Sequence, residues 1–179
     1  TFGAYGSGNK PKISGSDVVN TWTAYVGNTW KAICVTEPLQ VTMNGLWLSK
    51  GSTKETLNDH EWIWGTGTLY LRDDSGDPDG SVVIEAGKRN YVISDGGSSR
   101  GYIVVDGLEL DGSNSSFGGA VDFRVDGGPW TIKNCTIKNV ASFGVMALND
   151  NSIIDGNDIS YCGETGIFYH QAASGSTIT

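Results

Sequence analysis

Four side chains near the C-terminal end of the chain have types that could perform acid–base chemistry on a sugar. They are Asp122, Arg124, Tyr169 and His170. A polysaccharide lyase needs a cation to neutralise a uronate carboxylate and a base to remove the C5 proton. Arginine can bind the carboxylate through two hydrogen bonds, while histidine or tyrosine can act as the base. We therefore take these four as candidate catalytic residues, with Lys133 as a further basic group that could contact substrate.

Other carboxylates in this region offer alternative chemistry. Two carboxylates that flank a sugar can hydrolyse a glycosidic bond, and a cluster on one face can bind Ca²⁺ through its oxygens. However, Asp106, Asp111, Asp126 and Asp155 each precede a glycine. Asp-Gly pairs are typical of turns, in which the Asp side chain bonds to nearby backbone. We expect no cofactor, and no motif supports the Ca²⁺ alternative.

Aromatic side chains form a second group of candidates for sugar binding. Phe168 stands beside the candidate catalytic residues, and Trp62 and Trp64 lie on the same face of a predicted strand. Aromatic rings stack on the C–H faces of sugars. We therefore predict that Phe168, Trp62, Trp64 and Lys133 bind substrate. Packing in the core of a small β layer is the competing interpretation of the two tryptophans.

The elements that must position these residues repeat along the chain. Val105, Ile132, Ile154 and Ile178 occupy equivalent places, separated by 27, 22 and 24 residues. Each repeat contains short apolar segments of strand length, which are too small to bury a face alone. Repeats of this kind stack so that every strand pairs with its counterpart in the next repeat. The periodicity therefore predicts a β-solenoid.

Alternation along the strands predicts which side chains enter the core of this solenoid. The inward set is Val121, Phe123, Val125, Val145, Ala147, Ile167 and Tyr169. The outward set is Asp122, Arg124, Met146, Leu148, Phe168 and His170. The stacked core layers are expected to contain Val105, Leu108, Ile132, Ile137, Val145, Ile154, Ile159 and Ile167.

Four segments carry a likeness to a known family: residues 132–139 (IKNCTIKN), 144–148 (GVMAL), 154–160 (IDGNDIS) and 166–170 (GIFYH). They resemble the right-handed parallel β-helix proteins of the pectate-lyase-like superfamily, and residues 1–16 resemble an early coil of that fold. The resemblance implies an all-β fold, right-handed coiling and a carbohydrate-related activity. The lyase motifs of the family are not matched residue by residue, so none of its catalytic residues is transferred.

Residues 17–80 interrupt the repeats. Five of the six tryptophans fall in this stretch, among short alternating segments, and Asn44-Gly45 is a strong hairpin signal. We predict an antiparallel β insertion here, within a single β-helix domain of residues 1–179 that is a fragment of a longer chain. Regular coils are expected to resume at residues 81–86 and 90–94 and to continue to residue 179.

Composition excludes several classes of function. The formal net charge is −8 and Lys and Arg do not cluster, which argues against a nucleic-acid partner. No apolar run reaches the length of a membrane span. The spacing of Cys34, Cys135 and Cys162 fits neither a metal site nor a disulfide framework, so we predict free thiols and no metal site.

Two functions follow as hypotheses. The first is a secreted or cell-surface protein that binds, and could cleave, an acidic or plant-type polysaccharide, as a lyase or a glycoside hydrolase. The second is a non-catalytic structural solenoid of a surface fibre or adhesin. Thr1-Phe-Gly-Ala-Tyr and Thr177-Ile-Thr both resemble the start of a strand. Exposed strand edges pair readily with other chains, so end-to-end self-association is expected in the second case.

Overall fold

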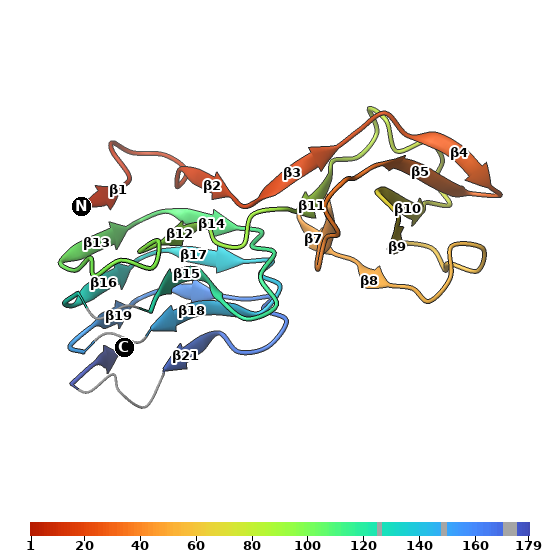
Figure 1. The fold of residues 1–179 in the computed structure, drawn as a ribbon. Helices are drawn as coiled ribbons and strands as arrows, with labels where there is room; N and C mark the ends of the chain where they lie inside the picture. The colour runs from red at the N-terminus through yellow and green to blue at the C-terminus, as the bar shows by residue number, and fades with distance from the viewer. Residues whose placement is uncertain (125–126, 148–149, 170–174) are drawn as a thin grey trace. The chain divides into compact units, whose positions relative to one another are not determined.

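The computed structural model describes residues 1–124, 127–147, 150–169 and 175–179, and its regular elements are strands throughout these ranges (Figure 1). The chain forms two compact units. The first unit comprises residues 1–15 and 89–179, and the second comprises residues 16–88. The prediction of an all-β fold is confirmed.

The first unit stacks short parallel strands into three sheets. The first sheet contains β1 (Phe2–Gly3), β13 (Ile103–Asp106), β16 (Trp130–Lys133), β19 (Ile153–Asp155) and β22 (Thr177–Ile178). The second sheet contains β2 (Lys12–Ser14), β14 (Glu109–Asp111), β17 (Thr136–Lys138) and β20 (Asp158–Ile159). The third sheet contains β12 (Ile93–Ser94), β15 (Gly119–Phe123), β18 (Phe143–Ala147) and β21 (Ile167–Tyr169). Each coil contributes one strand to each sheet, as in a solenoid.

The register of the first sheet follows the sequence repeat. Val105 pairs with Ile132, Ile132 with Ile154, and Ile154 with Ile178. Equivalent side chains therefore stack into layers inside the solenoid. Six of the eight predicted core residues are buried: Val105, Leu108, Ile132, Ile137, Val145 and Ile154. The other two, Ile159 and Ile167, are partly buried and pack against this core.

The second unit contains two sheets that are mainly antiparallel. One contains β4 (Thr23–Val26), β5 (Thr29–Ile33), β10 (Thr68–Arg72), β9 (Glu61–Gly65) and β8 (Ser49–Lys50). The other contains β3 (Ser16–Val19), β11 (Ile84–Gly87), β6 (Val41–Met43) and β7 (Leu46–Trp47). Asn44 and Gly45 join β6 to β7 with φ of 51° and 77°. Positive φ at both positions is what a tight hairpin turn requires.

The structure corrects one boundary. Residues 81–86 were expected to belong to the regular coils. Residues 84–86 instead lie in β11, which pairs antiparallel with β3 and β6 in the second unit. The strand that follows, β12, is the one that pairs parallel with β15. A short alternating strand carries no information about which strand will pair with it, so its sequence fits either unit.

Candidate functional site

The outer face of the third sheet carries a row of aligned side chains. Ser94 pairs with Asp122, Asp122 with Met146, and Met146 with Phe168 on four successive coils. Their neighbours in sequence, such as Val121, Val145 and Ile167, belong to or pack against the interior cluster. The alternation predicted from sequence thus places Asp122 and Phe168 in one row, two coils apart.

Arg124 is held at one end of this row by three groups. Its Nε donates a hydrogen bond to Asp122 Oδ1 over 2.6 Å, and its Nη2 donates to the Tyr91 hydroxyl. The guanidinium carbon lies 5.4 Å from the centre of the Tyr91 ring, and the backbone amide of Arg124 donates to Asp95 Oδ2. Nη1 has no hydrogen-bond partner among the described residues. This nitrogen is therefore available to a ligand.

Asp122 is almost completely buried, with 2% of its surface exposed. Burial raises the pKa of its carboxyl group, an effect opposed by the hydrogen bonds from Arg124 and from the Gly119 amide. Asp122 in turn raises the pKa of Arg124, so the guanidinium stays charged. Only a glycine fits at position 119, because a Cβ atom there would lie 2.6 Å from the Met146 nitrogen on the next strand, which is closer than atoms can approach.

Three phenylalanines form an aromatic cluster on the same face. The Phe143 and Phe168 rings are stacked with centroids 4.8 Å apart, and Phe117 meets Phe143 edge-on at 5.7 Å. Phe143 is buried, whereas 58% of Phe117 is exposed. The residue after Phe117, Gly118, packs closely against Asp122, since a Cβ atom on Gly118 would lie 2.9 Å from Asp122 Oδ2. The aromatic and polar groups are therefore neighbours.

A depression of about 630 Å³ opens beside Arg124. Its lining residues are Tyr91, Val92, Ser94, Asp95, Gly96, Gly97, Asp122 and Arg124. Planar polar groups next to an exposed ring are the elements that bind sugars, because hydroxyls take the hydrogen bonds and the ring covers the C–H face. We call the depression, Arg124 and the three phenylalanines the outer-face site.

Other predicted catalytic and binding residues lie elsewhere. Tyr169 packs against the interior cluster, on the opposite side of β21 from Phe168, because successive strand residues face opposite ways. Lys133 belongs to the first sheet, where its Nζ lies 3.3 Å from Asp106 Oδ2, so it does not converge with Arg124. His170 lies outside the described residues.

The tryptophan pair of the second unit is not an exposed platform. Trp62 is 1% exposed in the core of that unit, and its Nε1 donates to the Leu48 carbonyl. Trp64 is partly buried against the same core, with Nε1 donating to the Cys34 carbonyl over 2.6 Å. The competing interpretation, core packing, is correct for Trp62. Burying the large apolar surface of the Trp62 ring stabilises the core, and a ring that is buried in this way is not available to stack on a sugar.

Tyr91, Asp95, Phe117 and Phe143 belong to the outer-face site but are not among the site residues predicted from the sequence. A signal for two of them existed. Ser94 is equivalent to Asp122 one coil later, so Tyr91 and Asp95 flank the predicted site. Asp95 precedes Gly96-Gly97, a pattern that indicates a turn, and its Oδ1 does accept from the Gly97 amide within that turn. The turn pattern gives no sign that the other oxygen, Oδ2, accepts from the Arg124 amide.

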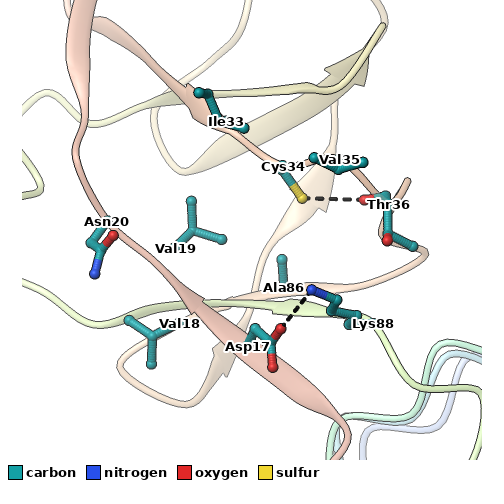
Figure 2. A pocket seen from close by; sticks show the side chains of 11 residues that line it. Asp17, Val18, Val19, Asn20, Ile33, Cys34, Val35, Thr36, Ala86 and Lys88 are labelled. Atoms are coloured by element: carbon teal, nitrogen blue, oxygen red, sulfur yellow. Dashed lines mark hydrogen bonds and ion pairs between the residues drawn. The ribbon is translucent and has the colours of Figure 1, made fainter.

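A smaller pocket of about 200 Å³ occurs within the second unit (Figure 2). Cys34 lies in its wall and donates a weak hydrogen bond to the Thr36 carbonyl, while Asp17 and Lys88 form an ion pair of 3.0 Å. Burial raises the pKa of the Cys34 thiol, which disfavours the reactive thiolate. Burial likewise raises the pKa of Cys135 and Cys162. None of the three has the environment of a nucleophile.

Comparisons with known proteins agree with this architecture. Residues 119–179 match the sequence profile of a family described as "Right handed beta helix region". The first unit is a right-handed parallel β-helix. A solved structure described as the complex of XylC with xylose matches 96% of the chain with a TM-score of 0.77 at 16% identity. That likeness shows the fold, and the narrower resemblance to pectate-lyase-like proteins stays a prediction.

A phage protein of described specificity is similar to part of the chain. The chain is 30% identical over 77 residues to a capsule K30/K69-specific depolymerase of Klebsiella phage K64-1. The match covers 42% of this chain and 9% of the depolymerase, and the chain spans 42% of the XylC structure. No helix in the part of the chain that the structure describes is long and apolar enough to cross a membrane.

Proposed function

We propose that this β-helix binds a polysaccharide along the outer face of β12, β15, β18 and β21. The observation that carries the proposal is the fixed guanidinium of Arg124, held by Asp122 and Tyr91, on the sheet face that also carries the exposed ring of Phe117. A preorganised polar group next to an apolar platform binds a ligand without the entropic cost of ordering its side chain.

The charge of the site favours neutral sugars. The guanidinium of Arg124 already pairs with the carboxylate of Asp122, so it is not free to neutralise a uronate carboxylate. The hydroxyls of a neutral sugar can instead accept from Nη1 of Arg124. In place of the uronate considered from the sequence, we propose a neutral sugar as the group that Arg124 binds.

The role of Asp122 in the proposal is to orient Arg124. Both of its oxygens accept hydrogen bonds, from Arg124 and from the Gly119 amide, and the residue is almost completely buried, so it is not placed to donate a proton to a sugar. Of the groups that a lyase would need, Tyr169 and Lys133 lie away from Arg124. The proposal is therefore binding, with Arg124 and Phe117 as the residues that contact the polysaccharide.

The relatives support the class of ligand. A capsule depolymerase and a xylose complex both concern carbohydrates, although the chain spans only part of each protein. Polysaccharides of capsules and plant walls lie outside cells. We accordingly propose that the protein acts in the extracellular space or at a cell surface.

Binding to immobilised polysaccharides tests the proposal. Wild-type protein is titrated against neutral xylan, polygalacturonate and purified K30 and K69 capsules, together with the Phe117→Ala and Tyr5→Ala variants. Tyr5 is a fully exposed aromatic in the turn between β1 and β2, strands of the other two sheets, and serves as the matched control. Phe117→Ala should weaken binding about threefold to tenfold, as expected for one aromatic contact. Binding to none of the four polysaccharides, or equal binding by all three proteins, would refute the proposal.

A further inference from the structure

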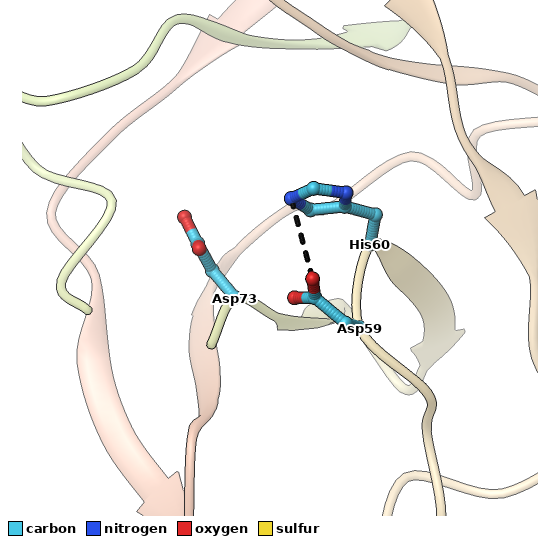
Figure 3. A group of neighbouring side chains, drawn as sticks. All are labelled: Asp59, His60 and Asp73. Atoms are coloured by element: carbon cyan, nitrogen blue, oxygen red, sulfur yellow. Dashed lines mark ion pairs between the residues drawn. The ribbon is translucent and has the colours of Figure 1, made fainter. Parts of the chain in front are cut away.

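One end of the β9–β10 hairpin brings together two carboxyl groups and an imidazole (Figure 3). Asp59 and His60 directly precede β9, and Asp73 directly follows β10. These strands pair antiparallel, with Leu71 opposite Trp62, and the His60 amide extends the ladder by donating to the Arg72 carbonyl. The pairing of the hairpin therefore fixes residues that are distant in sequence at the same end.

The three side chains lie close together. One possible ligand atom from each of Asp59, His60 and Asp73 lies within 4.8 Å of the others, and His60 Nε2 is 3.7 Å from Asp59 Oδ2. An open depression of about 320 Å³ has Asp59 and His60 in its lining, together with Trp47 and its neighbours. An ion could reach the cluster from solvent through this depression.

Asp73 provides an independent sign that a ligand is missing from this cluster. The residue is 1% exposed, and its Oδ1 accepts hydrogen bonds from the Ser75 amide and hydroxyl. Its Oδ2 is buried without a hydrogen-bond donor in the part of the chain described. A buried carboxylate oxygen with no partner is costly, and a cation bound among the three groups would remove that cost.

The nearest arginine does not neutralise the cluster. Arg72 directs Nε and Nη2 to the carboxylate of Asp74, and its Nη1 to the Leu57 carbonyl. Asp74 also accepts from the Asn28 amide, while the Asp74 backbone donates to Asp59 Oδ1. Among the residues that the structure describes, no cationic side chain is hydrogen-bonded to both Asp59 and Asp73.

We propose that Asp59, His60 and Asp73 bind a divalent transition-metal ion of the Zn²⁺ type. One imidazole and two carboxylates are ligands that Zn²⁺ accepts, whereas Mg²⁺ and Ca²⁺ favour oxygen ligands alone. Three protein ligands leave one position of a tetrahedral ion for water or another ligand from the depression. The expectation of no metal site rests on cysteine spacing and does not apply to a set that the hairpin assembles.

Binding requires a small contraction of the cluster. Two ligands that are each about 2.1 Å from Zn²⁺ lie at most about 4.2 Å apart. The side chains of His60 and Asp59 are 54% and 43% exposed, so core packing does not enclose them, and Asp59 Oδ2 can approach an ion while Oδ1 keeps its hydrogen bond from the Asp74 amide. Asp73 is the fixed ligand and the other two close on the ion.

The test is calorimetric titration of the chelator-treated chain with Zn²⁺, and with Mg²⁺ and Ca²⁺ for comparison. We expect one tight Zn²⁺ site and a rise of about 5 °C in Tm at saturating metal. His60→Asn retains a residue that tolerates the positive φ of 61° at this position and should weaken Zn²⁺ binding at least tenfold. Asp73→Asn, which keeps an oxygen acceptor for Ser75, should do the same.

Two controls separate this site from adventitious binding. His170→Asn removes the other histidine of the chain and should leave the affinity unchanged. Co²⁺ in place of Zn²⁺ should give weak visible bands without the strong thiolate charge-transfer band expected of Cys34, Cys135 or Cys162. Equal loss in His170→Asn and His60→Asn, a thiolate band, or Mg²⁺ binding as tight as Zn²⁺ would overturn the proposal. Polysaccharide binding by the first unit is independent of each of these outcomes.

Discussion

The Nε atom of Arg124 lies 2.6 Å from Oδ1 of Asp122. The Asp122 side chain is 3% exposed, whereas the Arg124 side chain is 29% exposed. The pair thus anchors an exposed cation on a buried anion. An arginine fixed in this way presents its outer edge in a defined orientation, which is the property that a binding site needs.

Removing the guanidinium of Arg124 should destabilise the fold, because the buried carboxylate of Asp122 loses its ion-pair partner. Arg124→Gln is expected to lower the free energy of unfolding at pH 7 by about 2–4 kcal/mol, because Asp122 is left charged without its partner. Urea unfolding monitored by tryptophan fluorescence measures the loss. The double variant Asp122→Asn/Arg124→Gln is the control and should recover part of it. A loss under 1 kcal/mol in the single variant would contradict a structural role for the pair.

The same variant predicts a pH dependence with a defined sign. The folded-state pKa of Asp122 is raised, so the folded protein binds this proton more tightly than the unfolded chain. Loss of Arg124 removes an interaction that lowers this pKa. The deficit of Arg124→Gln should therefore be small below pH 3.8, the ordinary value, and should grow as the pH rises through the folded-state pKa. A deficit that is constant from pH 3 to 7 would disagree.

The stacked core can be tested on adjacent isoleucines. Ile154 is 1% exposed within the β-helix, whereas Ile153 on the same strand is 43% exposed. Ile154→Ala should cost about 2–5 kcal/mol of unfolding free energy through lost burial and a cavity. Ile153→Ala serves as the control and should cost less than about 1 kcal/mol. Equal costs for the two variants would mean that the inward register is wrong.

Acid should weaken a surface contact between coils. The Asn134 amide donates to Asp106 Oδ1 and, with Lys133, lowers the pKa of that carboxyl. A lowered folded-state pKa stabilises the fold above the unfolded value, and this stability is lost as the pH falls through the folded value. The Tm advantage of wild type over Asp106→Asn should therefore be present at pH 6 and vanish toward pH 2. An advantage that increases on acidification would show the opposite sign.

The repeat predicted the β-helix well because its physical cause is local. Each coil needs an apolar residue at the same place, so Val105, Ile132 and Ile154 could be aligned before any contact was known. The outward row followed from alternation alone. What sequence could not provide was lateral position: Lys133 is chemically suitable, yet it lies on another sheet, and no pattern in the sequence records which corner of a coil a residue occupies.

The inserted unit was predicted less completely for the same reason. The turn at Asn44-Gly45 is local and was identified, whereas the partners of β11 and the convergence of Asp59 with Asp73 depend on pairing between distant strands. Trp62 shows the related difficulty with aromatic residues. A tryptophan suits both a core and a sugar platform, and the sequence pattern is identical in the two cases.

Amide chemical-shift mapping during titration with a saccharide tests the central claim most directly. Neutral xylo-oligosaccharides and fragments of the K30 and K69 capsules are the probes, added to isotope-labelled wild-type protein. The account predicts that the largest changes cluster at Tyr91, Phe117, Arg124 and Phe168, and that Tyr5 and Lys133 are unaffected. Changes centred on another surface, such as the depression of about 260 Å³ that Trp64 and Tyr70 line, would contradict it, as would no change with any of the probes.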